Sequence, residues 1–477
     1  MKRHLDLVLV VLVVSISILR GLFWIGVYPA LKIADEPSHF DDIQYRAEHA
    51  LRAPRAGDKV INPVLSPTAS RELSTLWAAT QHLWQAGFTT RRHAVPEERT
   101  LRDMASDPGS RVTNGQSSAI VYPGFAYTVA TIPYLLFSRA SVLVRVLAVR
   151  VASLAWGTLF AVCTFFAVRW TARDRSLALV GALFAIFQPL AAQQTVAVNN
   201  DAAVIALCAL LFVGQLALLR RPADTPSRGW LILLGCVTAL ALDTKPQAWA
   251  LVPGTMLLVL RALLASGRRR STQVALAVGV ASFIVMRVLV HLICDRMAPG
   301  IAAASVVAHP SIGPLGFAKF LWDLDDKFID YLFSTGWGSF CWLDVHLSSA
   351  WQDDLHSAAL VLWIACGIAA AIAWLFPDTR RFWDPGPVAF SFFTAATGFM
   401  VILFAEYYAR TYFLAVRAVQ GRALLVVLPA ATAFFATVLG TIVPARLRTL
   451  LAAIVAIGIV LLAAGSLVTV VAYEYVG

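Results

Sequence analysis

Residues 201–219 read DAAVIALCALLFVGQLALL, an apolar stretch whose one acid stands at its first position. About 20 apolar residues are enough for a helix to cross the hydrocarbon core of a bilayer. Further stretches of the same character lie at roughly 5–27, 146–168, 176–194, 229–244, 247–264, 272–293, 356–376, 386–405, 421–441 and 449–472. The pattern predicts an all-α polytopic membrane protein with about 11 transmembrane helices. The number ranges from 10 to 13, depending on how interrupted apolar stretches are counted.

The composition supports lipid as the main solvent of this chain. Of its 477 residues, 59% are hydrophobic and 14% are charged, whereas about 25% of the residues of a soluble protein are charged. These values exclude a soluble globular enzyme, a disordered chain and a disulfide scaffold. The net charge of +11 raises the question of nucleic acid, and the placement of the basic residues answers it.

Arginine is concentrated in short loops between the predicted helices. Thirteen arginines fall in the loops 169–175, 220–228, 266–271, 377–385 and 444–449, and the positive-inside rule makes such loops cytoplasmic. The N-terminus is then cytoplasmic, the C-terminus lies outside, and 23 of the 28 acidic residues fall on or near the outer side. Because much of the positive charge orients the helices, we expect no nucleic acid partner.

The apolar stretch 119–138 is interrupted by Pro123 and Pro133. If it were a span, the arginine-rich loops would lie outside the cell, which runs against the positive-inside rule. We therefore expect an interfacial or re-entrant helix at this place.

Two long outer segments join the helices of what we interpret as one transmembrane domain, 1–477. They run over 28–145 and 295–355. Within the first, the spacing of apolar residues over 70–86 predicts an amphipathic helix. Its apolar face suits either the membrane surface or packing against the rest of the loop, and the sequence leaves both open.

The first candidate site is Asp35-Glu36-Pro37-Ser38-His39, one turn beyond the first span. A carboxylate held at a membrane surface can accept a proton from an acceptor hydroxyl, as a general base does. The alternative is structural, because Pro37 suits the first helical position and would make Glu36 the cap residue. Both interpretations can hold together, since a helix start also holds a carboxylate in place.

Two further candidates lie at the outer ends of predicted helices. Asp201 begins the stretch 201–219, where an ionisable residue indicates either a site or a helix cap. Lys245 precedes Pro246 in a turn between two spans, and its compact ammonium suits a phosphate. The alternative for Lys245 is a pair with Asp243 that neutralises both charges.

The tract 406–422 contains outer-face arginines that run against the positive-inside bias. They are Arg410, Arg417 and Arg422. Their guanidinium groups match phosphate oxygens, and pairing with Glu406 is the alternative. In the second outer segment, Trp342 and Asp344 could stack on a sugar and hydrogen-bond to it, although aromatic residues also form belts at membrane interfaces.

Six short motifs follow one another along the chain. They are Ala34-Asp35-Glu36-Pro37-Ser38-His39-Phe40, Tyr122-Pro123-Gly124-Phe125-Ala126-Tyr127, Val198-Asn199-Asn200-Asp201-Ala202, Ala241-Leu242-Asp243-Thr244-Lys245-Pro246, Gly338-Ser339-Phe340-Cys341-Trp342-Leu343-Asp344 and Gln420-Gly421-Arg422. In this order they resemble a bacterial family of uncharacterised membrane proteins with a D-E-P-x-H motif, which belongs to the GT-C class of membrane glycosyltransferases. The second motif departs from the class by lacking its tandem proline, and Cys341 stands where the family has Gly.

This resemblance implies a GT-C-like fold and sugar transfer on the outer face of the bacterial plasma membrane. The donor would be a polyprenyl-phosphate-linked sugar, and the acceptor an envelope glycan, lipid or protein. The reaction would invert the anomeric carbon, with Asp35 as base beside Glu36, and with Lys245 and Arg422 near the donor phosphate, whose developing charge fixed cations stabilise. The other candidates for substrate binding are His39, Asp201, Arg410, Arg417, Trp342 and Asp344.

The metal requirement and the reaction class stay open at this point. A divalent cation (Mg, Mn or Ca) could bind Asp35, Glu36 and Asp201, because hard cations prefer carboxylates. The alternative functions are a lipid-linked glycan transporter or flippase and a glycan polymerase. A transporter would need charged residues deep within several spans, and Arg287 with His291 in one span is the main such feature. The sequence contains no Gly-rich nucleotide loop, so ATP-driven transport has no support.

Overall fold

The computed structural model places most of the chain. It describes residues 2–33, 35–51, 70–77, 98–112, 119, 122–222, 227–265, 270–294, 314–324, 326–337, 339–340, 345–348, 350–358, 361, 368, 385–413 and 419–472. The span expected over 356–376 falls almost wholly outside these ranges.

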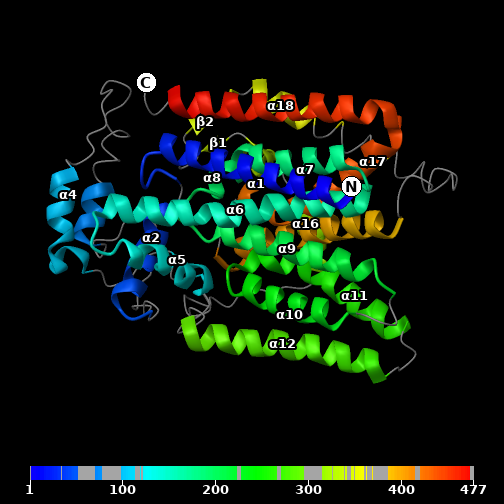
Figure 1. Ribbon diagram of the computed structural model, residues 1–477, viewed down its shortest axis with the longest axis horizontal. Coiled ribbons are helices and arrows are strands. Elements are labelled where there is room, and N and C mark those ends of the chain that lie inside the picture. The colour runs from blue at the N-terminus through cyan, green and yellow to red at the C-terminus, as the bar shows by residue number, and fades with distance from the viewer. Residues whose placement is uncertain are drawn as a thin grey trace.

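Seven helices of the described ranges are long and apolar enough to cross a membrane. They are α1 (Lys2–Val27), α6 (Val142–Ala172), α9 (Asp201–Leu219), η4 with α11 (Pro246–Leu251 and Val252–Ala265), α12 (Arg270–Cys294), α16 (Pro385–Phe413) and α18 (Ala445–Val471). Figure 1 shows them side by side along the long axis of the molecule. Helices satisfy their own backbone groups, which lipid cannot do, and the expected all-α polytopic membrane protein is confirmed.

Four shorter apolar helices complete the bundle or lie at its end. They are α5 (Phe125–Leu136), α7 (Arg175–Phe187), α10 (Arg228–Leu242) and α17 (Leu428–Ile442). The span expected over 176–194 is not one helix, because α7 ends before Gln188 and α8 (Pro189–Gln194) begins with proline. The Gln188 side chain accepts a hydrogen bond from the Ala191 amide at 2.5 Å and so caps the new helix.

The span expected over 421–441 also has two parts, because η7 (Gly421–Val426) is a 3-10 helix and precedes α17. The break expected at Lys245-Pro246 is present, since α10 ends at Leu242 and η4 begins at Pro246. Proline cannot donate the next helical hydrogen bond. These breaks leave polar residues at helix ends rather than within apolar helices.

One end of the bundle is covered by short helices. α2 (Glu36–Glu48), α4 (Glu98–Ala105), η2 (Pro108–Arg111) and α5 gather beside the end of α6, as Figure 1 shows at the left. α5 has 12 residues and is about 18 Å long, shorter than the roughly 30 Å of a bilayer core. Its length suits the interfacial or re-entrant helix that the sequence predicts over 119–138.

The described part of the amphipathic segment is helical over 71–77. Leu73 and Leu76 are buried in one cluster with Phe40 and Tyr134. Of the two alternatives, packing against the rest of the loop therefore holds for this part of the segment.

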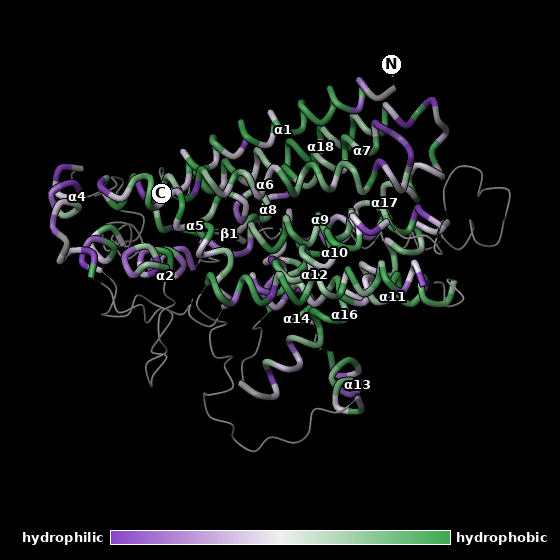
Figure 2. The backbone as a smooth tube through the Cα atoms, turned by 60° about the horizontal axis from the view of Figure 1, so that its bottom comes forward, coloured by the Kyte–Doolittle hydropathy of each residue, from purple (hydrophilic) through white to green (hydrophobic). Residues whose placement is uncertain are grey.

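Two helices lie apart from the main layers, and a short hairpin follows them in the chain. α13 (Pro314–Trp322) and α14 (Asp326–Trp337) lie below the bundle in Figure 2. They are followed by β1 (Ser339–Phe340), which pairs antiparallel with β2 (Val345–His346). α14 contacts η7, and this contact positions the segment that carries Arg422.

The core is built from small and branched side chains where helices meet. The largest buried cluster includes Ala161 of α6, Ala182 of α7 and Ala206 of α9, and small residues let membrane helices approach closely. Leu19 of α1 and Leu461 of α18 are exposed apolar residues. Since these helices are candidate spans, such side chains are suited to contact lipid.

Candidate functional site

Asp35 is the residue immediately before α2. It has a φ of 64° and its side chain makes no capping hydrogen bond. The sequence predicts Glu36 as the cap residue, but the helix begins one residue earlier, with Asp35 in the cap position and Pro37 in the first turn. A left-handed conformation at a non-glycine residue costs about 1 kcal/mol or more, and here it leaves the carboxylate free to bind Arg422.

Glu36 has a different environment from its neighbour. The side chain is fully buried in an ion pair with Arg150, at 2.7 Å from Nε and 2.5 Å from Nη2. Its Oε1 also accepts a hydrogen bond from the Val198 amide at 3.0 Å. Arg150 donates in addition to the carbonyls of Tyr28 and Pro29. Glu36 thus ties the first loop to α6 and to the segment before α9.

Asp201 is the first residue of α9, and Asn199 performs the capping there. The Asn199 side-chain oxygen accepts hydrogen bonds from the amides of Asp201 and Ala202 at 3.0 and 3.2 Å. The Asp201 carboxylate is therefore not needed as a cap. It binds Lys245 Nζ at 2.6 Å and Arg422 Nη1 at 3.4 Å.

Lys245 lies in the break between α10 and η4. Its backbone is extended, with φ −162° and ψ 143°, as expected for a residue before proline. The ammonium contacts Asp201 and lies 4.9 Å from the centre of the Tyr122 ring. The expected alternative, a pair with Asp243, is wrong, because Asp243 pairs with Arg287 of α12 at 3.2 Å.

Arg422 contacts both aspartates of the cluster. Its Nη2 donates to Asp35 at 2.7 Å, and its Nη1 lies 3.4 Å from Asp201. The preceding Gly421 donates its amide to Thr335 of α14 at 2.8 Å. A Cβ at Gly421 would lie 2.2 Å from the backbone nitrogen of Gly336, so glycine is needed where η7 meets α14.

His39 is buried between two tyrosine rings on the inner face of α2. The ring centres of Tyr122 and Tyr127 lie 5.9 and 5.6 Å from that of His39. The Tyr127 hydroxyl is 2.7 Å from His39 Nδ1. Burial lowers the pKa of His39 to about 4, although the nearby Asp35 acts in the opposite direction. The imidazole is therefore neutral at neutral pH.

Exposure separates Asp35 from the other charged groups of this cluster. The side chain of Asp35 is 32% exposed, whereas those of Asp201 and Arg422 are 4% and 15% exposed. Burial raises the pKa of Asp35, but the charge of Arg422 outweighs it and holds the pKa below its usual value. Burial likewise lowers the pKa of Arg422, and Asp201 and Asp35 together raise it above its usual value. Both groups are charged at neutral pH.

Of the remaining candidates, only Arg410 falls within the described residues, and it lies outside this cluster. Arg410 donates to Glu406 at 2.8 Å and lies over the rings of Phe320 and Phe328, so the alternative of a pair with Glu406 holds. Arg417, Trp342 and Asp344 lie outside the described residues.

The proposed carboxylate ligands of a metal do not converge. Glu36 points to Arg150, whereas Asp35 and Asp201 are joined by Arg422. Among the residues that the structure describes, no group of three or more His, Cys, Asp or Glu side chains could hold a metal ion.

Three residues of this region are not predicted individually from the sequence. Tyr122 and Tyr127 occur in a motif there, but in the structure both rings enclose His39, and the Tyr122 ring also covers Lys245. Arg150 was counted within a predicted span. The signal that could have found it is an arginine inside an apolar helix, which must have a partner there.

Five of the six motifs meet at this cluster through Asp35, Tyr122, Asp201, Lys245 and Arg422. A family model described as "Predicted membrane protein (DUF2142)" matches residues 18–431. The chain belongs to the DUF2142 family of predicted membrane proteins. The DUF2142 match runs from within α1 into α17 and includes all five of these residues. No curated protein matches the chain.

Solved membrane proteins with a similar arrangement share little sequence with this DUF2142 member. ArnT from Cupriavidus metallidurans bound to undecaprenyl phosphate is 16% identical, with a TM-score of 0.39, over 74% of this chain and 64% of ArnT. The apo oligosaccharyltransferase from Archaeoglobus fulgidus is 10% identical, with a TM-score of 0.46, over 99% of this chain and 56% of its own. This chain thus spans less than two thirds of either protein.

Proposed function

We propose that this protein is a glycosyltransferase that moves a sugar from a polyprenyl-phosphate-linked donor to a hydroxyl acceptor. The observation that carries the proposal is the ion-pair chain Asp35–Arg422–Asp201–Lys245. It places one accessible carboxylate beside two cations that are fixed by buried contacts. A general base next to an anion site is what the attack of a hydroxyl on a phosphate-linked sugar requires.

In the proposed reaction, the acceptor hydroxyl attacks the anomeric carbon of the donor sugar. The new glycosidic C–O bond forms as the C–O bond to the phosphate breaks, so the anomeric carbon is inverted in one step. The bonding electron pair leaves with the phosphate, next to Arg422 and Lys245. The hydroxyl proton passes to Asp35. Fixed cations in a poorly hydrated site stabilise the leaving phosphate without reorganisation.

Donor binding would also strengthen the base. In the absence of substrate, Arg422 holds the pKa of Asp35 below its usual value, which makes Asp35 a weak proton acceptor. A donor phosphate that draws the Arg422 guanidinium toward itself weakens the ion pair, and the pKa of Asp35 then rises. Asp35 would thus gain basicity when the leaving group is in place.

Glu36 and Asn199 serve as positioning residues in this proposal. Glu36 with Arg150 holds the loop that bears Asp35, and Asn199 caps α9 so that the Asp201 carboxylate stays available to Lys245. Neither residue needs to contact the reacting atoms.

We place the protein in the bacterial plasma membrane, with the N-terminus in the cytoplasm and the cluster at the outer face. The arginine-rich loops motivate this orientation. A crystal structure of ArnT contains undecaprenyl phosphate, and a structure of an archaeal AglB is a complex with a dolichol phosphate. We propose a lipid of this class as the donor carrier here. The proposal rests on the residues of this chain rather than on those structures.

The test is sugar transfer by the full-length protein in liposomes, with radiolabelled undecaprenyl-phosphate sugars and an envelope extract as acceptor. We expect Asp35→Asn to lower kcat by at least about 100-fold, because a general base contributes factors of this order. Asp103→Asn on exposed α4 makes the same charge change away from the cluster and should leave transfer unchanged. Normal turnover by Asp35→Asn would reject Asp35 as base.

Two other outcomes would favour the alternative functions. Movement of labelled lipid across the liposome membrane without a transfer product would favour a transporter or flippase. Transfer of a lipid-linked oligosaccharide rather than a single sugar would favour a glycan polymerase.

A further inference from the structure

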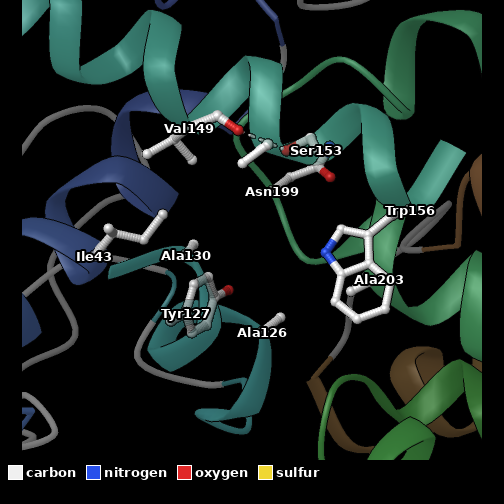
Figure 3. A pocket seen from close by; sticks show the side chains of 10 residues that line it. Ile43, Ala126, Tyr127, Ala130, Val149, Ser153, Trp156, Asn199 and Ala203 are labelled. Atoms are coloured by element: carbon white, nitrogen blue, oxygen red, sulfur yellow. Dashed lines mark hydrogen bonds between the residues drawn. The ribbon is translucent and has the colours of Figure 1, made fainter. Parts of the chain in front are cut away.

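A pocket lies next to the cluster, between α2, α5, α6 and the start of α9. It is lined by Ile43, Ala126, Tyr127, Ala130, Val149, Ala152, Ser153, Trp156, Asn199 and Ala203. Figure 3 shows the rings of Tyr127 and Trp156 on two sides of it, with Ser153 and Asn199 along a third. The pocket therefore has aromatic walls and a lining of small apolar side chains.

Three polar side chains of the lining already have protein partners. The Tyr127 hydroxyl bonds to His39, and the Ser153 hydroxyl donates to the Val149 carbonyl. The Asn199 side chain binds Gln194 and two backbone amides of α9. Apart from the indole N–H of Trp156, the pocket thus offers mainly carbon to a ligand. Such a surface suits a hydrocarbon segment and would leave the hydroxyls of a polysaccharide chain without partners.

The pocket is connected to the cluster through two of its lining residues. Tyr127 reaches the cluster through its hydrogen bond to His39, whose charge state depends on Asp35 and Asp201. Asn199 lies two positions before Asp201 and caps the same helix. The pocket therefore adjoins the residues that surround the cluster.

One lining residue of the pocket is exposed on a candidate membrane span. Ala152 of α6 lines the pocket and is exposed. An exposed apolar residue on a helix long and apolar enough to cross a membrane is suited to contact lipid. The position of Ala152 therefore favours access to the pocket from the bilayer.

We propose that this pocket holds the hydrocarbon segment of the acceptor, so that the acceptor is a hydroxyl-bearing lipid that enters between α5 and α6. This inference rests on the proposed function, because it assigns the second substrate of the same reaction. The chain would lie against Tyr127 and Trp156, and its hydroxyl would reach Asp35. The proton and the sugar then move as described above.

The test uses photo-crosslinking, which does not depend on transfer activity. Full-length protein in detergent is incubated with hexadecanol that carries a diazirine, and labelled peptides are mapped by mass spectrometry. We expect labels on the α5 and α6 peptides that contain Tyr127 and Trp156. Ala152→Trp, which fills the opening, should lower this labelling by about tenfold or more. Val151→Trp adds the same side chain one position away, outside the lining, and should leave the labelling intact.

A second variant and a competition experiment separate the possible outcomes. Ala130→Leu fills the pocket from α5 with a smaller side chain, so it guards against misfolding of the tryptophan variant. Equal labelling of the wild type, Ala130→Leu and Ala152→Trp would overturn the proposal. It would also be overturned if undecaprenyl phosphate competed with the probe while unlabelled hexadecanol did not, because the pocket would then hold the donor chain.

The transfer assay distinguishes a lipid acceptor from a polysaccharide acceptor. Labelled product that partitions into butanol supports a lipid acceptor, and labelled product that stays in water as a polymer contradicts it. If the wild type transfers no sugar but is labelled in the pocket as expected, the proposed function fails while the lipid site stands.

Discussion

Two adjacent acids in one motif have different environments. Asp35 is partly exposed and pairs with Arg422, while Glu36 is fully buried and pairs with Arg150. The difference comes from the backbone, because the left-handed conformation of Asp35 precedes the first helical residue, Glu36. Neighbouring side chains at a helix start point in different directions, and each meets a different arginine.

We expect Glu36→Gln to destabilise the protein by about 3–5 kcal/mol, because it leaves the buried Arg150 without its counter-charge. Thermal melting in detergent measures this change. Asp35→Asn is the matched control and should melt near the wild type, since Asp35 is partly exposed. Wild-type melting of Glu36→Gln together with lost transfer would instead make Glu36 a participant in the chemistry.

Arg422→Lys should lower kcat for sugar transfer by about 100-fold, the scale of losing one preorganised donor to developing charge. A lysine has one point charge and cannot reach both Asp35 and Asp201 as the guanidinium does. Arg410→Lys, in the same tract but paired with Glu406, should leave kcat near the wild-type value. Equal losses in the two variants would contradict the separation of these arginines.

His39 predicts a pH dependence of stability. Its pKa is lowered by burial from 6.5 to about 4 in the folded protein, so the unfolded chain binds the proton more tightly. The neutral imidazole of His39 therefore leaves the free energy of unfolding at its full value above pH 6.5. This free energy decreases as the pH falls from 6.5 toward about 4. The loss amounts to at most about 3 kcal/mol. His39→Gln should show a shallower fall of melting temperature over this window, and an unchanged slope would contradict the assignment.

Breaks between helices, rather than helices themselves, carry the charged cluster. Asp201 lies at the start of α9, Lys245 in the break before η4, and Arg422 in η7. Each break has a local cause, such as Pro246 or the cap formed by Asn199. A polar side chain at a helix end can meet its partners without entering the hydrocarbon.

Gly421→Ala tests how η7 is positioned. The added Cβ would lie 2.2 Å from the Gly336 nitrogen and 2.4 Å from the Leu332 carbonyl oxygen, so α14 and η7 would have to separate and Arg422 would move. We expect a lower melting temperature and a loss of transfer. Gly458→Ala in α18 has nothing within 4 Å of the added Cβ, and it should be neutral or stabilise the helix by up to about 1 kcal/mol.

The two ends of the whole molecule differ in their charge pattern. The end with α2, α4 and α5 holds the cluster, whereas Asp6 pairs with Arg169 and Arg175 where α1 begins and α6 meets α7. Arginines near the ends of membrane helices favour the cytoplasm. The protein as a whole is therefore expected to present the cluster to the outside.

Cysteine labelling tests this orientation. In a variant without the six native cysteines, Asp103→Cys on α4 should react with a membrane-impermeant maleimide in intact cells. Arg446→Cys at the start of α18 should react only after the membrane is permeabilised. The reverse pattern would place the cluster on the cytoplasmic side and contradict the proposed use of an outer-face donor.

Much of the architecture could be predicted from the sequence, because helix formation in lipid depends on local apolar length. The span 201–219 appears as α9 with the same bounds, and Pro246 marks the expected break. The split of 176–194 was missed, because the cap at Gln188 depends on side-chain geometry that apolar length does not reveal.

The sequence by itself determined that this chain is an α-helical membrane protein, and it placed Asp35, Asp201, Lys245 and Arg422 in a longer set of candidates that also held Glu36, His39, Arg410, Arg417, Trp342 and Asp344. Only the tertiary structure decided which charges meet. Asp35 and Arg422 are 387 positions apart, and their contact depends on how α2, α14 and η7 pack. Residue spacing encodes the face of a helix, whereas an ion pair between distant segments exists only after the helices have packed.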